Sequence, residues 1–123
     1  MANYVENFEF EGKTIIVDYT EHEFDEIAAK FGVEILSKTQ IEYPFINTGI
    51  GVQSSAYLYE YTSQKTNKKA YLYQISYFYI DEVSFQFFSC EDKIDDLAGM
   101  IKYYDKIDAE HLAKLRAEKQ EEK

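Results

Sequence analysis

Residues 55–90 decide the fold, and they read SAYLYEYTSQKTNKKAYLYQISYFYIDEVSFQFFSC. Three runs in this stretch are rich in aromatic and aliphatic residues and are separated by polar connections, which predicts antiparallel strands. The expected strands lie at 55–62, 70–80 and 83–90. The second connection, Asp81-Glu82, is short enough for a tight turn, but it has no glycine to fix the register. This segment therefore predicts the centre of an antiparallel sheet.

Side chains alternate across a strand, so residue parity assigns each one to a face of the sheet. A two-residue turn at Asp81-Glu82 pairs Phe78 with Phe85. If the first hairpin also pairs Tyr59 with Tyr73, one face gathers seven tyrosines: Tyr57, Tyr59, Tyr61, Tyr71, Tyr73, Tyr77 and Tyr79. The opposite face is apolar and is expected to form the core under the helices, with Ala56, Leu58, Leu72, Phe78, Ile80, Val83, Phe85 and Phe87.

The expected seven-tyrosine face has the chemistry of a protein-binding surface. A tyrosine ring supplies apolar area, its hydroxyl tolerates water when no partner is bound, and tyrosine is enriched among binding hot spots. Three different roles would produce the same pattern of tyrosines. Cross-strand aromatic pairs stabilise sheets, the C-terminal helix can cover the face, and aromatic sheets also stack the bases of single-stranded nucleic acids.

The segment before residue 55 predicts two short strands and a helix, followed by a further strand. The strands lie on either side of a turn at Glu11-Gly12-Lys13. Thr20-Glu21-His22-Glu23 fits a capping box, in which the threonine and the second glutamate cap the first turn of a helix. The apolar face of that helix carries Phe24, Ile27, Ala28 and Phe31, and Gly32 stands where a left-handed C-terminal cap belongs. Residues 33–43 predict a further strand.

The C-terminal third predicts helices. Ser89 followed by Asp92 fits a cap, and an apolar stripe at helical spacing reaches Tyr104. A second helix is expected to start at Asp108, and residues 117–123 are expected to fray. The whole chain, 1–123, is thus expected to be one α+β domain. It has an antiparallel sheet of about five strands, one helix after the first strands and a helical C-terminus.

The charge is strongly acidic and unevenly distributed. The chain has 23 acidic and 13 basic residues, a net charge of −10, and residues 1–34 hold nine of the acids against two bases. Direct binding to nucleic acid is disfavoured, because that affinity comes from lysine and arginine. An acidic surface is instead attracted to basic proteins such as those that handle nucleic acids. The acids expected to meet such a partner surround the helix start: Glu21, Glu23, Asp25 and Glu26. Solubility alone also accounts for an acidic surface.

No motif for catalysis, a cofactor or a metal stands out. His22 and His111 lie far apart, Cys90 is the single cysteine, and zinc sites need ligands in local pairs. No glycine-rich phosphate-binding loop occurs. The chain also lacks an apolar run of membrane-spanning length and an N-terminal signal pattern. We therefore expect a cytoplasmic protein without enzymatic activity, metal, cofactor or membrane contact.

In size, acidity, richness in tyrosine, isoleucine and lysine, and lack of recognisable chemistry, the chain resembles small phage-encoded inhibitors of bacterial defence such as anti-CRISPR proteins. The resemblance is one of composition over the whole chain and assigns no site residue. It implies a protein-binding inhibitor that blocks a basic nucleic-acid-handling protein, in the manner of a nucleic-acid mimic. Toxin-neutralising immunity proteins share the same profile, and a structural or assembly protein of a phage is a third alternative.

Overall fold

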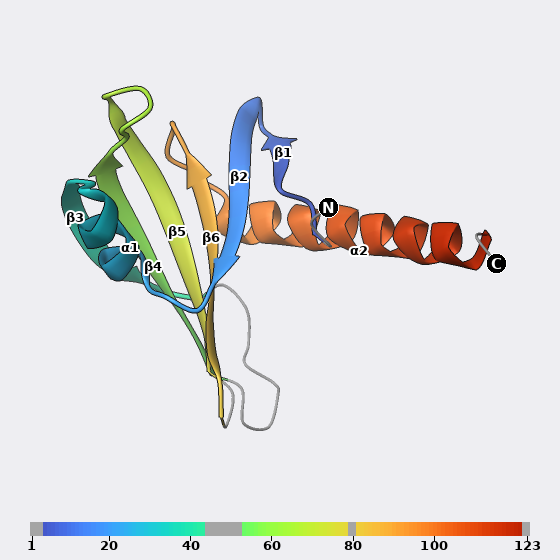
Figure 1. Cartoon of the computed structure of the whole chain (residues 1–123). Helices are drawn as coiled ribbons and strands as arrows, with labels where there is room; N and C mark the ends of the chain where they lie inside the picture. Colours follow the sequence, from blue (N-terminus) through green and yellow to red (C-terminus); the bar gives the residue numbers. More distant parts are fainter. Residues whose placement is uncertain (1–3, 44–52, 79–80, 122–123) are drawn as a thin grey trace.

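The computed structural model describes residues 4–43, 53–78 and 81–121. Within these residues the chain is an α+β fold with one antiparallel sheet of order β1-β2-β6-β5-β4-β3 and two helices (Figure 1). The sheet therefore has six strands rather than about five. They are β1 (Asn7–Phe10), β2 (Lys13–Thr20), β3 (Ile35–Ile41), β4 (Gln53–Thr62), β5 (Lys69–Phe78) and β6 (Val83–Cys90). The helices are α1 (Phe24–Phe31) and α2 (Leu97–Glu121).

The turn between β1 and β2 lies where the sequence predicts it. Glu11 and Gly12 both have positive φ, 52° and 76°, which is the backbone geometry that matches the twist of two hairpin strands. The hairpin places Phe8 opposite Ile15, so that both side chains enter the core.

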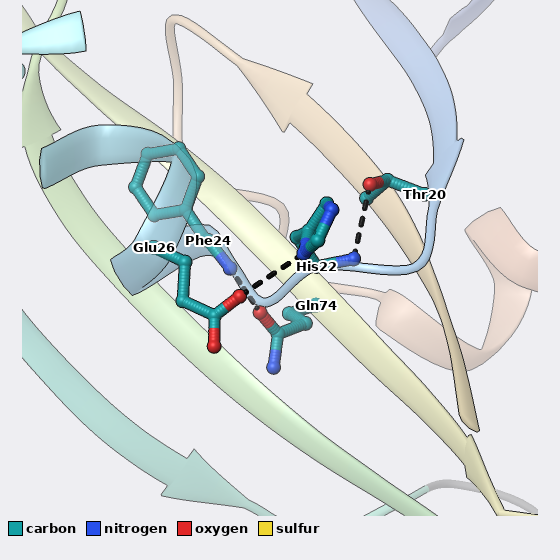
Figure 2. A network of polar contacts seen from close by, with 5 residues as sticks. All are labelled: Thr20, His22, Phe24, Glu26 and Gln74. Carbon is teal, nitrogen blue, oxygen red and sulfur yellow. Dashed lines mark hydrogen bonds and ion pairs between the residues drawn. The ribbon is translucent and has the colours of Figure 1, made fainter. Parts of the chain in front are cut away.

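Helix α1 ends as expected but begins differently. Gly32 adopts the left-handed conformation at φ 71°, and Val33 N donates to Ala28 O at 2.8 Å. The capping box is wrong, because Thr20 Oγ1 accepts a hydrogen bond from His22 N instead. The first helical amide, Phe24 N, donates to Oε1 of Gln74 on β5 at 2.8 Å (Figure 2). The cap of α1 thus comes from a residue distant in the sequence.

The sheet is covered by one helix on each face. On what we call the α1 side, Phe24 and Ala28 pack in one cluster with β4, β5 and β6, through Tyr59, Leu72, Phe85 and Phe87. On the α2 side, Met100, Ile101 and Tyr104 belong to one cluster with residues of β1, β2, β4, β5 and β6: Phe8, Ile15, Val17, Ala56, Tyr73, Ile75 and Phe88. Figure 1 shows α2 starting near β6, passing β2 and β1 and projecting beyond β1. Both faces of the central strands are therefore core.

The C-terminal third is one helix, so the expected second start at Asp108 is wrong. The Asp108 carboxylate accepts a hydrogen bond from Val5 N at 2.9 Å and ties the N-terminal segment to α2. The cap also differs, because Asp96 Oδ1 accepts from Gly99 N at 3.0 Å, whereas Ser89 belongs to β6. Helical structure continues through the expected tail to Glu121. Neither α1 nor α2 combines the length and hydropathy that a membrane-spanning helix needs.

Candidate protein-interaction surface

The tyrosines of β4 and β5 lie on opposite sides of the sheet, so the expected seven-tyrosine face is wrong. Tyr59 is opposite Leu72, and Leu58 is opposite Tyr73, one residue away from the expected Tyr59–Tyr73 pair. A slip of one residue moves every side chain of a strand to the other face. The α1 side receives Tyr57, Tyr59 and Tyr61, and the α2 side receives Tyr71, Tyr73 and Tyr77. Tyr79 lies outside the described residues.

The loop between β4 and β5 sets this register. Ser63 N donates to Lys68 O, and Asn67 N donates to Ser63 O, both at 2.8 Å. Asn67 sits at φ 57°, a left-handed conformation that asparagine tolerates better than most residues. The closed loop places Thr62 opposite Lys69. The β5–β6 register instead differs from expectation by two residues, with Phe78 opposite Val83, which leaves the faces of those strands as predicted.

Two of the tyrosines are sealed in the core. Tyr59 is fully buried with the Phe24 ring of α1 4.9 Å from its own, and burial together with the nearby Asp25 raises the pKa of its hydroxyl. The Tyr73 hydroxyl donates to Ile94 O at 3.0 Å and accepts from Ile94 N at 3.1 Å, which fixes the segment before α2. Neither ring is open to a partner, and Tyr77 donates its hydroxyl proton to Gln86.

Of the four acids expected at the start of α1, two are exposed. These are Glu21 and Glu26, and Glu26 Oε2 lies 3.2 Å from His22 Nδ1 (Figure 2). Glu23 is half-buried at the helix start, where it makes no side-chain cap. Asp25 is half-buried and engaged within the protein. The surface contribution of this cluster is therefore smaller than the sequence predicts.

Asp25 belongs to a cation-centred cluster with β3 and β4. Its Oδ2 lies 2.9 Å from Lys38 Nζ, which also lies 4.9 Å from the Tyr57 ring centre and 5.5 Å from that of Tyr59. Burial opposes ionisation of Asp25, but its ion pair with Lys38 and the nearby Tyr59 hydroxyl outweigh it and lower the pKa of the carboxyl. Within the described residues, neither Asp25 Oδ1 nor the Tyr59 hydroxyl makes a hydrogen bond of regular geometry. The cluster holds α1 against the strands and neutralises one acidic residue.

The strands β1 and β2 supply acids that the sequence reasoning did not single out. Asp18 is opposite Phe87, and Glu9 is opposite Thr14, which places both on the α1 side. Burial by neighbouring atoms and the charge of Glu6 raise the pKa of Asp18, so Glu6 and Asp18 repel each other. We use the term acidic side for four exposed carboxylates: Glu9, Asp18, Glu21 and Glu26. Glu6 precedes β1 and its backbone carbonyl accepts a hydrogen bond from Val17 N, so it borders this surface.

An apolar residue lies on β2 beside Asp18. Ile16 is 48% exposed on the same strand face as Asp18, because α1 packs over β4, β5 and β6 and leaves β2 uncovered on this side. The alternation of Thr14, Ile16 and Asp18 in the sequence is the signal that could have located this face. The arrangement suits a positively charged protein surface with an apolar spot.

A hollow of about 450 Å³ adjoins Ile16, which lines it, and extends between the β1–β2 turn, the end of β6 and the β4–β5 loop. Its lining includes the cations Lys13 and Lys65 and the anions Glu91 and Asp92, so its charge favours no single class of ligand. Across the described ranges, no group of three or more histidine, cysteine or acidic residues is placed to hold a metal ion. Cys90 is a buried free thiol.

Comparison of the chain with protein-family models, with curated proteins and with solved structures found no match.

Proposed function

We propose that the protein is a non-enzymatic protein-binding inhibitor that captures a basic, nucleic-acid-handling protein through its acidic side. The observation that carries the proposal is the set of four exposed carboxylates of the acidic side, two of which, Glu9 and Asp18, share a strand face with the exposed Ile16. Among the described residues, the ion pairs include one of the four, Glu26 with His22, and that pair exists only when the histidine is protonated. A partner's lysine or arginine side chains would supply the missing charge.

The charge acts mainly on the rate of capture. A surface of one sign steers an oppositely charged protein during diffusion and raises the association rate, whereas buried contacts govern dissociation. Glu6 and Asp18 repel each other in the free protein, and a cation placed between them relieves that repulsion. Ile16 supplies apolar area that binding can remove from water. The tyrosines have no such role in this proposal, since Tyr59 and Tyr73 are in the core.

Two variants with the same charge separate this surface from net charge. The acidic-side variant carries Glu9→Gln, Asp18→Asn, Glu21→Gln and Glu26→Gln. The control variant carries four substitutions at exposed acids elsewhere: Asp81→Asn, Glu82→Gln, Glu110→Gln and Glu118→Gln. Each variant loses four negative charges from the net −10 of the chain. Each protein is immobilised, exposed to a nuclease-treated bacterial lysate and analysed by mass spectrometry.

The proposal predicts that the wild type and the control variant retain the same basic nucleic-acid-binding protein, and that the acidic-side variant does not. Equal retention by both variants would mean that net charge, rather than this surface, attracts the partner. Retention of an acidic protein, or of one that handles no nucleic acid, would also overturn the proposal.

A further inference from the structure

The two edges of the sheet are not equally protected. Edge strand β1 has four residues, and its Phe8 and Phe10 rings contact Tyr103 of α2 at 5.9 and 6.0 Å between ring centres. Edge strand β3 has seven residues, and no other strand of the described chain pairs with its outer edge (Figure 1). Such an edge presents unpaired N–H and C=O groups that can hydrogen-bond to another chain.

The devices that usually protect an edge are weak along β3. A bulge interrupts the register between Ile35 and Ser37, but from Ser37 to Ile41 the pairing with β4 is regular. A lysine on an edge strand normally discourages pairing. Here Lys38 is bound to Asp25 and lies over the rings of Tyr57 and Tyr59, so its charge is compensated.

The surroundings of this edge are apolar at one end and acidic at both. Leu36 is 49% exposed, and Phe31, at the end of α1 that leads into β3, is 61% exposed. Glu34 and Glu42 flank the strand and are both exposed. Antiparallel pairing with a second copy would place Glu34 near Glu42 of that copy and bring together two molecules of net charge −10. The charges therefore disfavour a second copy and favour a basic segment.

We propose that the outer edge of β3 binds an extended basic segment of the partner as a seventh strand of the sheet. Main-chain hydrogen bonds to β3 would hold the segment, and lysine or arginine residues near its ends would meet Glu34 and Glu42. Apolar side chains of the segment would contact Leu36 and Phe31. This inference rests on the proposed function, because it gives the basic partner a second contact with the protein.

The test uses the full chain and a defined probe, the blocked peptide Lys-Thr-Val-Thr-Val-Thr-Val-Thr-Lys. Hydrogen exchange is followed by NMR for each backbone amide. We expect exchange of fast amides within residues 36–41 to slow about ten-fold when the peptide is present at about nine times its Kd. Amides of β1 should not change. A peptide with the same side chains and N-methylated backbone amides should give no protection, and one with glutamate at both ends should give less.

A charge-reversed pair tests the ends of the strand. Glu34→Lys with Glu42→Lys should weaken peptide binding, whereas Glu110→Lys with Glu118→Lys, which changes the net charge equally, should not. The inference is overturned if residues 36–41 are not protected, or if the N-methylated peptide protects them equally. It is also overturned if they become protected at high protein concentration without peptide, which would assign the edge to a second copy. The acidic-side variant should retain peptide protection. If that variant is protected by the peptide but still captures the same basic protein as the wild type, the proposed function alone is refuted.

Discussion

The cap that Gln74 gives to α1 yields the sharpest structural prediction. Gln74 is 1% exposed, and its Oε1 accepts the buried Phe24 amide hydrogen at 2.8 Å, whereas its Nε2 makes only a 3.4 Å contact with Ser76. Gln74→Met keeps the length of the side chain and removes the acceptor, so little cavity forms. The unpaired amide costs about 1–3 kcal/mol. Because the substitution also removes a poorly paired buried amide group, we expect a net loss of about 1–2 kcal/mol.

Urea denaturation of wild type and variant measures this loss directly. With an unfolding entropy of about 2.1 cal/mol/K per residue, the same change lowers the thermal midpoint by about 4–8 °C. Amides of α1 should exchange faster by a larger factor than those of β5, because the helix loses its anchor. The matched control is Gln40→Met at an exposed position of β3, where the change should stay within about 0.5 kcal/mol. A Gln74→Met loss as small as that of the control would refute the cap.

Three further predictions test the helix cap, the acidic side and the core tyrosines. Asp96→Ala should lower the free energy of unfolding by about 1 kcal/mol, because the cap of α2 is lost. Gly99→Ala should be nearly neutral in the wild type, because its new methyl meets the Asp96 carboxylate, but should stabilise the Asp96→Ala variant by about 1 kcal/mol. A double-mutant cycle in urea measures this coupling. The pKa of Asp18 is raised in the folded protein, so its ionised form is unfavourable at neutral pH; Asp18→Asn should raise the thermal midpoint at pH 7, with the gain lost below about pH 4, and a gain that persisted at low pH would exclude this cause. Tyr73→Phe should cost about 1–3 kcal/mol, because it leaves both backbone groups of Ile94 unpaired, whereas Tyr59→Phe should cost about 0.5 kcal/mol or less; equal losses would contradict the assigned contacts.

Sequence patterns predicted turns and helix ends correctly where the conformation of one or two residues determines them. The turn at Glu11-Gly12 and the cap at Gly32 depend on positive φ, and glycine at both sites marks them. The start of α1 does not depend on local chemistry, because its first amide is paired with Gln74, fifty residues away. No capping motif in the sequence can report such a contact. The sequence also could not show that the Asp108 carboxylate accepts a hydrogen bond from Val5 N, far away in the chain, instead of capping a new helix.

Which side chains share a face of the sheet depends on the register between neighbouring strands, and the sequence did not determine the register between β4 and β5. Parity alone assumed one apolar face and one open face, as in a sheet packed on one side. Phe88 contradicts that assumption within the sequence itself, because it follows Phe87 directly and one of the two must leave the assumed core face. Both are buried here, since α1 and α2 cover opposite sides. The loop that shifts β4 by one residue depends on Asn67 in a left-handed conformation, a choice that no glycine marks.

The sequence predicted only some of the residues of the acidic side, because the others reach it through strand pairing. The excess of acids in residues 1–34 indicated an anionic surface, and Glu21 and Glu26 belong to it. Sequence reasoning assigned the partner-binding acids to the helix start alone, at Glu21, Glu23, Asp25 and Glu26. The pairing of β2 with β6 brings Asp18 to the same side, and the ion pair with Lys38 takes Asp25 out of it. The identity of the surface therefore follows from long-range strand pairing.

The salt dependence of capture shows whether the charge of the acidic side attracts the partner. The association rate constant of the captured basic protein is measured from about 50 mM to about 500 mM salt, over which exposed charges become screened. If the acidic side attracts the partner, the rate constant should fall about ten-fold or more for the wild type and the control variant, and much less for the acidic-side variant. A rate that is independent of salt, or the same dependence in both variants, would contradict this attraction.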